Sequence, residues 1–563
     1  MRTGRSRRKF PLAASFLKAC LQKSHRPGFG HSPFPGRWHK LLHIGNLIVQ
    51  GMPLRFKMIV RFYEGMANNM TEHFNIAIVG GGFSGTMLAV QLLRRDSGIR
   101  VAVIDKSSAP GLGLAYSTED PNHLLNVPAE NMSAFPDEPD HLVRWARSNY
   151  DPSFRPESFL PRMVYGQYLV SLLQAATARS GNRLSWLRDQ AVSLTPQGEH
   201  FILQLNEGQQ LQAKAVVLAL GNSAPPDLNI PGLSGSASRY AATAWSPNAL
   251  GGLSGHEDIL LIGSGLTSVD MAISLHGRGF KGKIYIVSRR GLLPQTHRES
   301  ESRPDFSAED FPQTARSLLR LIRNKTRSAK KEGGNWRPVI DAIRPVTSQI
   351  WSSLPPHERT RFLRHLRPYW EVHRHRVAPG IGAKLAAMIE KGQVEVHGGR
   401  LVKYSENDAF AEVTFRERGS GQLRELRVNR VINCTGSEGD CRRINDPLLN
   451  SLIAQQLARP DPLFLGLDVD ANGVLFGSNG IASSALYAIG PARKGRLWES
   501  VAVPELRVQA AQLAEHLVHR TVDAERAVAG GRGPDFARKK DSQNTPRKER
   551  EEEEEDYVFG NSK

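Results

Sequence analysis

A strand, a glycine-rich turn, a helix and a second strand occur twice along the chain, with the same spacing in both copies. Each copy begins with a short apolar run that ends at a glycine, as strands buried in a parallel sheet do. Gly80 and Gly263 are 183 residues apart, and so are Asp105 and Ser288 at the ends of the two units. The first unit comprises residues 75–79, 86–94 and 100–104, and the second comprises 258–262, 269–276 and 284–287. The pattern predicts an α/β protein with two Rossmann-like units in tandem.

The first glycine turn, Gly80 to Gly85, fits the pattern G-x-G-x-x-G. Gly80 permits a tight turn, Gly82 lets backbone amides approach a pyrophosphate, and Gly85 lets the helix pack on the sheet. Asp105 lies twenty residues after Gly85, where a carboxylate accepts hydrogen bonds from a ribose. We therefore predict a dinucleotide site here, the alternative being a plain glycine-rich turn.

The second turn contains Gly263 and Gly265 but has Ser268 at the place of the third glycine. A serine fits at this place if the helix and the strand lie slightly further apart. Ser288, Arg289 and Arg290 stand where an acidic residue would bind an unphosphorylated ribose. A guanidinium pairs with a 2′-phosphate, whereas a carboxylate repels it. The second site is predicted to prefer NADPH to NADH, and the alternative is a solvated basic strand end.

Two dinucleotide sites in one chain indicate an electron path from NADPH at the second site to FAD at the first. A disulfide reductase needs a redox-active cysteine pair, but Cys20, Cys434 and Cys441 form no C-x-x-C motif. The cysteines provide no zinc site either. Molecular oxygen, a quinone and a carrier protein remain open as electron acceptors.

The second unit is expected to be inserted in the first. Strands predicted at 215–221 and 430–436 each end in a glycine, which fits a chain that leaves the first domain near Pro225 and returns near Leu401. Residues 299–379 are rich in Arg and His and have helical stretches separated by prolines, as expected of a helical lid or a substrate-binding element. The expected parts are a basic leader at 1–73, an FAD-binding domain at 74–228 and 401–520, an NADPH-binding domain at 255–400 with the lid inside it, and a disordered charged tail at 521–563.

Much of the positive charge lies in the leader. The 563-residue chain has a net charge of +19, yet residues 1–63 hold thirteen Lys and Arg and no acidic residue, so the rest carries about +6. Nucleic acid is therefore not an expected partner. The leader resembles a twin-arginine export signal or a transit peptide, but we favour a translation start at Met66 or Met70. No apolar run is long enough for a membrane span, and a cytoplasmic location is expected.

Several further motifs resemble those of bacterial FAD/NAD(P)-binding proteins related to FAD-dependent urate hydroxylase and to the flavin enzyme that oxidises the amino group of aspartate toward nitrosuccinate. The resemblance covers about residues 75–518 and rests on the segments 111–118, 123–129, 132–134, 373–379 and 486–491. It implies a flavin monooxygenase in which NADPH reduces FAD, and reduced FAD activates oxygen as a C4a-(hydro)peroxide. Water must be excluded for that species to survive.

Candidate site residues lie in these motifs. Asn126, on an apolar loop, is a candidate polar group near the flavin, and a loop-capping role is the alternative. The resemblance implies that Gly490 lets the backbone approach the flavin, although Pro491 replaces the acid often found next. If residues 373–376 are extended, Arg374 and Arg376 share one face and present two guanidiniums to an anionic substrate or to NADPH. A surface strand or interdomain salt bridges are the alternative, and no metal site is expected.

These observations predict an NADPH-dependent flavin monooxygenase that hydroxylates a small anionic or nitrogen-containing metabolite with molecular oxygen. The alternatives are a flavoprotein reductase that passes electrons to a quinone or carrier protein, and a non-catalytic FAD-binding sensor. Residues alone do not indicate the oligomeric state or the substrate.

Overall fold

The computed structural model describes residues 72–95, 98–107, 109–298, 306 and 311–529, with side-chain burial described up to residue 521. The expectations for the leader up to residue 71 and for the tail beyond 529 lie outside these residues. Two predicted boundaries differ from the structure. The first strand already begins at Glu72, because Glu72 pairs with Leu211. The last helix continues to Ala529, so 521–529, predicted to be disordered, are helical.

The first sheet is built around β1, the strand of the first glycine turn. β1 runs parallel to β2 on one side and to β6 on the other, and β15 continues the parallel order beyond β6. Its strands are β1 (Glu72–Val79), β2 (Val101–Ile104), β3 (Leu184–Leu187), β4 (Ala191–Gln197), β5 (His200–Leu205), β6 (Gln210–Leu218), β14 (Val474–Phe476) and β15 (Ala482–Ala488). Ile76, Ala77 and Ile78 are at most 1% exposed, because both faces of the sheet are covered. Ile76 and Ile78 pack against helices on one face, and Ala77 packs with residues of β4, β5 and the helix Pro447–Ala454 on the other.

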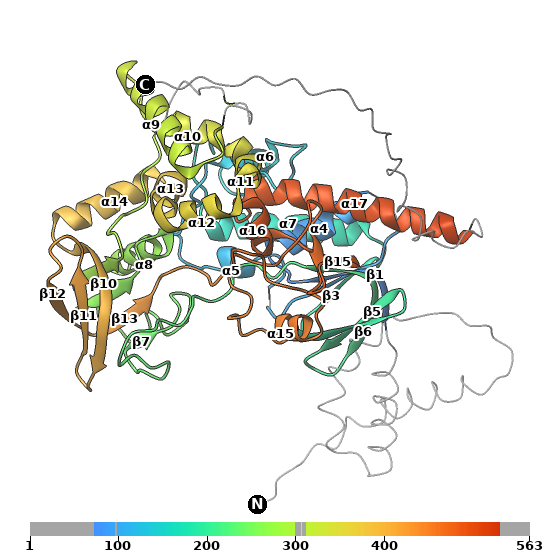
Figure 1. Ribbon diagram of the computed structural model, residues 1–563, viewed down its shortest axis with the longest axis horizontal. Helices are drawn as coiled ribbons and strands as arrows, with labels where there is room; N and C mark the ends of the chain where they lie inside the picture. Colours follow the sequence, from blue (N-terminus) through green and yellow to red (C-terminus); the bar gives the residue numbers. More distant parts are fainter. Residues whose placement is uncertain (1–71, 96–97, 108, 299–305, 307–310, 530–563) are drawn as a thin grey trace, which may run out of the picture. The chain divides into compact units, whose positions relative to one another are not determined.

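The second sheet has β8 near its centre, parallel to β9 on one side and to β13 on the other. Its strands are β7 (Tyr240–Ala241), β8 (Ile259–Ile262), β9 (Ile284–Ser288), β10 (Val394–Glu406), β11 (Ala411–Glu417), β12 (Leu423–Val428) and β13 (Arg430–Asn433). All of them lie in sequence between β6 and β14 (Figure 1). The predicted fold class, two Rossmann-like sheets with the second inserted in the first, is therefore confirmed.

The expected return to the first domain near Leu401 is wrong. β10 pairs in parallel with β9 through Gly398 and then continues as the first strand of an antiparallel β10–β11–β12 ribbon. This ribbon and β13 extend the second sheet to Asn433. The chain crosses back only near Glu438, where Ser223 Oγ donates to the Glu438 carbonyl over 2.6 Å.

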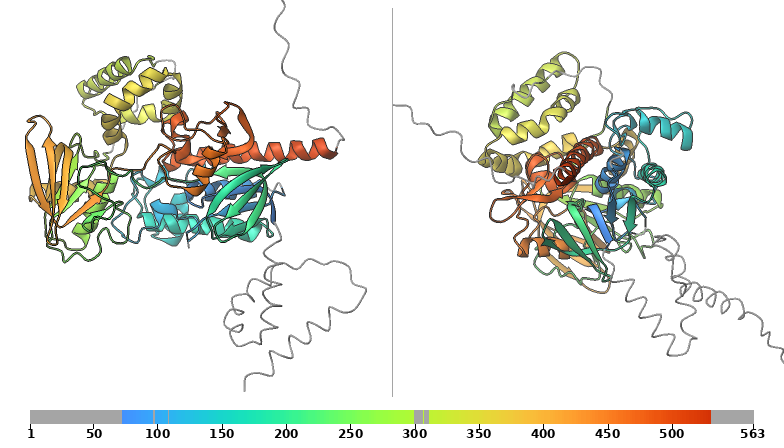
Figure 2. Two further views of the ribbon diagram at one scale, coloured as in Figure 1. Left: turned by 60° about the horizontal axis from the view of Figure 1, so that its bottom comes forward. Right: turned by 90° about the vertical axis from the view of Figure 1, so that its right-hand side faces the viewer.

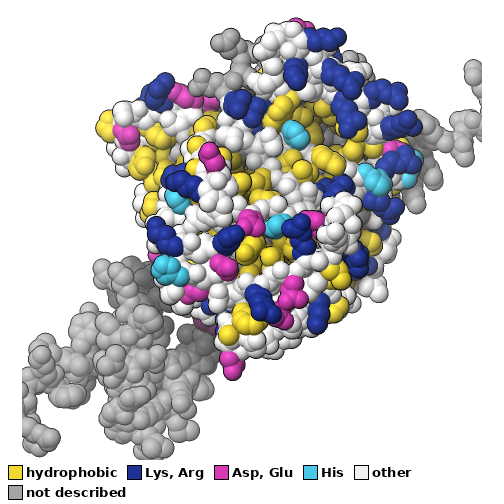
Figure 3. All heavy atoms as spheres, turned by 90° about the vertical axis from the view of Figure 1, so that its left-hand side faces the viewer, with side chains coloured by type: hydrophobic (Ala, Val, Ile, Leu, Met, Phe, Trp, Pro, Cys, Tyr) yellow, Lys and Arg dark blue, Asp and Glu magenta, His cyan; other side chains and the backbone are white. Residues whose placement is uncertain are grey.

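The helices of the inserted part include a separate group, α9 to α13, that stands apart from both sheets in Figure 2. Its members are α9 (Ala315–Lys331), α10 (Arg337–Ile343), α11 (Thr347–Ser353), α12 (Pro356–His365) and α13 (Arg367–Arg374). Thr314 caps α9, and the buried Glu358 of α12 accepts a hydrogen bond from the Ala315 amide over 2.8 Å. α9 lies at the top of Figure 1, and Lys and Arg side chains gather along the top of the face drawn in Figure 3.

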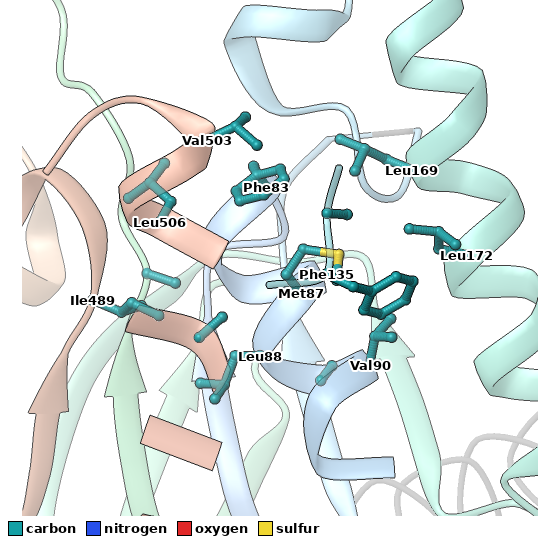
Figure 4. Packing of buried hydrophobic residues seen from close by; sticks show 14 of the residues in the cluster. Phe83, Met87, Leu88, Val90, Phe135, Leu169, Leu172, Ile489, Val503 and Leu506 are labelled. Atoms are coloured by element: carbon teal, nitrogen blue, oxygen red, sulfur yellow. The ribbon is translucent and has the colours of Figure 1, made fainter. Parts of the chain in front are cut away.

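One face of the first sheet is covered by α4 (Phe83–Arg94), the helix that follows the first glycine turn. Figure 4 shows its apolar side chains between those of α7 (Arg162–Arg179) and α17 (Val503–Ala529). The labelled residues are Phe83, Met87, Leu88 and Val90 of α4, Leu169 and Leu172 of α7, Val503 and Leu506 of α17, and Phe135 and Ile489 from loops. Burying each such side chain stabilises the fold by roughly 1.5–3 kcal/mol. This packing holds the start of α4 in a defined place.

The remaining helices are short or flank the sheets. They are α4 (Phe83–Arg94), α5 (Gly113–Tyr116), α6 (His141–Asn149), α7 (Arg162–Arg179), α8 (Leu266–Gly277), α14 (Pro379–Glu390), α15 (Pro447–Ala454), α16 (Lys494–Leu497) and α17 (Val503–Ala529). Among the described residues, no helix combines the length and apolarity that crossing a membrane requires.

Candidate dinucleotide-binding site

The first glycine turn needs glycine for steric reasons. Gly80 has φ +106°, and a Cβ there would lie 2.2 Å from the Ala219 carbonyl oxygen. A Cβ on Gly85 would lie 1.9 Å from the Gly80 carbonyl oxygen. The backbone of β1, the turn and α4 therefore approach one another more closely than any other residue type permits.

The amides at the start of α4 have no side-chain cap. Gly82 is the N-cap residue, no side chain bonds to the first turn, and the turn holds no acidic residue. Unsatisfied N–H groups at a helix N-terminus attract anions. Gly490 lies at the same place, since a Cβ on it would be 2.8 Å from Ser84 Oγ. A cofactor glycine implied by the resemblance is thus brought to the first turn from more than 400 residues away.

Asp105 lies beside this turn, at the end of β2. Its Oδ2 accepts a hydrogen bond from the Gly81 amide over 2.5 Å, and its Oδ1 accepts one from the Ser107 amide over 2.7 Å. Each carboxylate oxygen has a second lone pair, so the group can still accept from ribose hydroxyls. Trp186 packs on the same turn, and its buried Nε1–H has no partner among the described residues. Sequence reasoning missed Trp186, because no motif marks it.

The second glycine turn repeats the geometry of the first. Gly263 has φ +107°, and a Cβ there would lie 2.6 Å from the Cys434 carbonyl oxygen. Gly265 caps α8 with backbone angles close to those of Gly82, and the space a Cβ would occupy on it is open. Ser268 donates from Oγ to the Gly263 carbonyl over 2.5 Å, so its hydroxyl is satisfied within the turn.

The three residues after the second unit have different environments. Ser264 Oγ donates to the Leu292 carbonyl over 2.6 Å, so Ser288 Oγ donates to Ser264 Oγ over 2.7 Å, and it accepts from the Gly291 amide over 3.0 Å. Ser288 therefore holds the turn together. Arg290 stacks on Tyr369, with its guanidinium carbon 5.0 Å from the ring centroid, and donates to the Tyr369 hydroxyl. Arg289 is exposed and pairs with no carboxylate in the described part of the chain. Arg289 is thus the free cation at this strand end.

Both turns fit the phosphate groups of a dinucleotide. Each has an uncapped helix start without acidic residues, and the second has open space at Gly265. FAD is expected at Gly80, Gly82, Gly85, Asp105, Asn126 and Gly490, and NADPH at Gly263, Gly265, Ser268, Ser288, Arg289 and Arg290. These residue assignments stay predictions.

Asn126 lies where the two parts of the chain meet. It is half-buried, and its backbone carbonyl accepts a hydrogen bond from His297 Nε2 over 2.9 Å. Because a carbonyl can only accept, His297 must carry its proton on Nε2. Burial, followed by the nearby Arg376, lowers the pKa of His297 to about 4. His297 was not predicted, because an isolated histidine before a loop has no sequence signal.

Residues 373–376 are not an extended segment, so the condition under which Arg374 and Arg376 were expected to share one face is not met. Residues up to Arg374 form α13, and both arginines are at least 94% buried. Arg374 Nη2 lies 3.5 Å from Glu499 and 3.4 Å from Glu505, and Arg376 pairs with Asp341. The alternative interpretation, salt bridges between parts of the chain, fits this geometry. Burial alone would raise the pKa of Glu499, but Arg374 and His375 hold it below its ordinary value.

Cations outnumber carboxylates where α10 and α13 meet the start of α17. The guanidiniums in this described group are those of Arg337, Arg344, Arg374 and Arg376, and the carboxylates in contact with them are those of Asp341, Glu499 and Glu505. Arg337 is 6% exposed, and its Nε and Nη2 donate to the Thr296 carbonyl. A buried cation without a carboxylate costs several kcal/mol, which a bound anion would offset.

The two described cysteines are poorly suited to redox exchange. Cys434 belongs to the core of the second sheet and Cys441 to that of the first. Burial raises the pKa of Cys434 to about 12 and that of Cys441 to about 11, so neither is a thiolate near neutral pH.

The comparisons with known proteins agree with this fold. Residues 77–223 match the family model described as FAD-NAD(P)-binding. The match includes the first glycine turn and Asp105. No curated protein matches the chain.

Solved structures share the arrangement of both sheets. A cadaverine monooxygenase of desferrioxamine biosynthesis from Erwinia amylovora, solved with FAD, is 14% identical, has a TM-score of 0.57, and matches 81% of this chain and 96% of its own. The ornithine hydroxylase of Pseudomonas aeruginosa has 15% identity, TM-score 0.54 and coverage of 80% and 99%. The ornithine N-hydroxylase of Kutzneria sp. 744 was solved with reduced FAD, NADP⁺ and L-ornithine. It is 13% identical, has a TM-score of 0.53, and matches 80% of this chain and 100% of its own. At these identities the likeness concerns the fold.

Proposed function

We propose that the chain is an FAD-dependent, NADPH-using monooxygenase that hydroxylates a small metabolite with molecular oxygen. The observation that carries the proposal is the pair of uncapped glycine turns at the starts of α4 and α8. The strand–turn–helix–strand unit around the first turn is followed by the carboxylate of Asp105, and the unit around the second turn by the free cation Arg289. The first would hold FAD and the second NADPH, which supplies the electrons that flavin chemistry needs.

The proposed substrate is an acid that carries a nitrogen group. The excess of buried guanidinium charge around Arg337 favours an anionic group, and Arg337 has no carboxylate partner among the described residues. The monooxygenases with the same fold act on ornithine and cadaverine, which supports oxidation at an amine. The motif resemblance to the aspartate-oxidising and urate-hydroxylating enzymes supports the same substrate class. NADPH supply favours a cytoplasmic location.

The chain's own residues would protect the reaction from water. Asn126 and the neutral His297 lie between the first sheet and the inserted part, and Phe159 packs against the His297 ring at a centroid distance of 5.2 Å. His297 donates its Nε2 proton to the Asn126 carbonyl, which leaves the Asn126 side chain free to hydrogen-bond a ligand. A mostly apolar site with few oriented donors slows the loss of reactive oxygen species to water.

Absorbance spectroscopy of the purified protein tests this proposal. We expect a yellow protein that NADPH bleaches without oxygen and that air recolours. NADPH oxidation should then be screened against urate, aspartate, ornithine and simple amines, with product mass as the readout. A colourless protein that FAD cannot reconstitute would contradict the proposal.

Two other outcomes point to the alternatives. Slow reoxidation by air with fast reduction of a soluble quinone would identify a reductase. FAD binding without NADPH oxidation under any condition would identify a non-catalytic flavoprotein. The buried positions of Cys434 and Cys441 argue against a disulfide substrate.

A further inference from the structure

A nine-residue segment, 118–126, joins the first sheet's side of the molecule to α8, and we call it the bridging loop. His123 in this loop is 4% exposed, with Nε2 2.8 Å from Ser274 Oγ and Nδ1 2.7 Å from Thr118 Oγ1. Ser274 Oγ is also 2.5 Å from Asp120 Oδ2. The loop therefore contacts α8 through a hydrogen-bond network in which His123 and Asp120 both contact Ser274.

One arrangement of protons satisfies the whole chain of contacts. Asp120 accepts from Ser274, so the Ser274 oxygen must accept from His123 Nε2–H. The other ring nitrogen lies 2.7 Å from the Thr118 hydroxyl oxygen. Burial alone would raise the pKa of Asp120, but hydrogen bonds from Ser274 and Asn122 hold it below its ordinary value. His123 therefore carries a proton on Nε2, and these contacts hold its ring in one orientation.

A second contact fastens the same loop to the same helix. Arg162, at the start of α7, binds Asp270 of α8 in a bidentate manner, with N–O distances of 2.8 and 3.1 Å. Both side chains are at most 14% exposed. Arg162 also donates from Nε to the Leu124 carbonyl and from its amide to the His123 carbonyl. One guanidinium thus holds both the bridging loop and α8.

These contacts lie close to both glycine turns. α8 begins at Leu266, directly after the second turn, and Asp270 and Ser274 are one and two helical turns further on the same face. The bridging loop ends at Asn126, which contacts His297. A rigid helix and a short loop therefore connect the second glycine turn to the place where the flavin is expected.

We propose that Asp270 and Ser274 are positioning residues that align NADPH with FAD for hydride transfer. The inference rests on the proposed function. The step transfers one hydride, a proton with two electrons, from NADPH to FAD and leaves NADP⁺. Hydride transfer depends on the placement of donor and acceptor within a fraction of an ångström, so loosening α8 slows this step. Oxygen reacts only with the flavin, so its reaction does not depend on α8.

The experiment measures the two half-reactions of the FAD-loaded full chain separately. D270N and S274A are compared with E395Q, which removes an exposed ion pair with Lys283 elsewhere in the second sheet. Stopped-flow mixing with NADPH without oxygen gives the limiting rate of flavin reduction. Dithionite-reduced enzyme mixed with oxygen gives the rate of reoxidation.

We expect D270N to reduce at least tenfold more slowly and S274A at least threefold more slowly, with reoxidation within twofold of wild type for both. The apparent Kd for NADPH should change less than threefold, and E395Q should behave as wild type. The reversed pair R162D/D270R should recover at least part of the rate lost in D270N. S274A keeps the test open if D270N does not fold.

Different failures overturn different statements. A wild-type enzyme that NADPH does not reduce overturns the proposed function and this inference with it. A normal wild type whose variants reduce at the wild-type rate overturns the inference alone. Equal slowing of both half-reactions, or loss of FAD, shows a merely structural role and also overturns it.

Discussion

Ser268 occupies the place in the second glycine turn that Gly85 has in the first. We expect a serine at position 85 to be far more damaging than a glycine at position 268. A side chain on Gly85 would meet the Gly80 carbonyl oxygen at 1.9 Å, whereas Ser268 already fits and bonds to Gly263. We expect G85S to abolish FAD binding or to lower the free energy of unfolding by about 3 kcal/mol or more. S268G should cost about 1 kcal/mol from the lost hydrogen bond. Urea denaturation and bound FAD measure both, and equal costs would contradict the steric explanation.

Arg289 is the side chain on which nucleotide preference should depend. It is exposed and unpaired among the described residues, whereas Arg290 is held by Tyr369 and Ser288 by the turn. We expect R289E to raise KM for NADPH at least tenfold and to leave KM for NADH nearly unchanged. R290E, the matched control, should have a smaller effect. An R289E enzyme with the wild-type preference for NADPH would contradict the assignment of the second site.

His297 makes stability depend on pH. Because its pKa in the folded chain is about 4, against an ordinary 6.5, the unfolded chain takes up a proton at a higher pH than the folded one. The free energy of unfolding should therefore fall as pH drops from 6.5 to 4, by about 3 kcal/mol in total for this group. H297Q removes the contribution. Urea titrations at several pH values should give a shallower slope for H297Q, and identical slopes would refute the explanation.

At the level of elements, the helical group α9 to α13 is attached to the start of α17 by buried ion pairs. Glu505 receives hydrogen bonds from Arg344 over 2.7 and 3.1 Å and also contacts Arg374. E505Q leaves both cations short of a counter-charge and should lower the free energy of unfolding by about 3 kcal/mol. E371Q breaks a half-exposed pair with Arg367 and should cost about 0.5 kcal/mol or less. Similar unfolding midpoints for the two variants would contradict this difference.

At the level of the whole molecule, the charge distribution should act on the approach of anions. α9 carries seven exposed Lys and Arg, at positions 316, 320, 323, 325, 327, 330 and 331, and no acidic residue. A surface of one sign attracts oppositely charged ligands, and salt screens the attraction. We expect kcat/KM for NADPH to fall severalfold between about 20 mM and 500 mM salt. A variant with Gln at 316, 320 and 323 should show a weaker salt dependence, and an unchanged one would exclude this role.

The local pattern of the chain determined the two dinucleotide units. Strand–glycine–helix spacing depends on contacts between residues that are near in sequence, such as Gly80 with Gly85, so the pattern predicted β1, α4, β8 and α8 within a few residues. The fold class was confirmed for the same reason. The residues at the unit ends, Asp105 and Arg289, also follow from spacing alone, because a strand of known length sets where its last side chain lies.

Only the tertiary structure decided which distant segments meet. The boundary expected at Leu401 was wrong because β10 crosses from parallel to antiparallel pairing, which depends on partners on either side and not on its own residues. Arg374 and Arg376 were expected to face a ligand, yet both are buried. They pair with carboxylates that lie 35 and 131 residues away in sequence. The contacts of Arg162 with Asp270 and of His123 with Ser274 have no local signal for the same reason. Which charged residues pair across such separations depends on the tertiary packing. The local pattern of the sequence does not show these pairs.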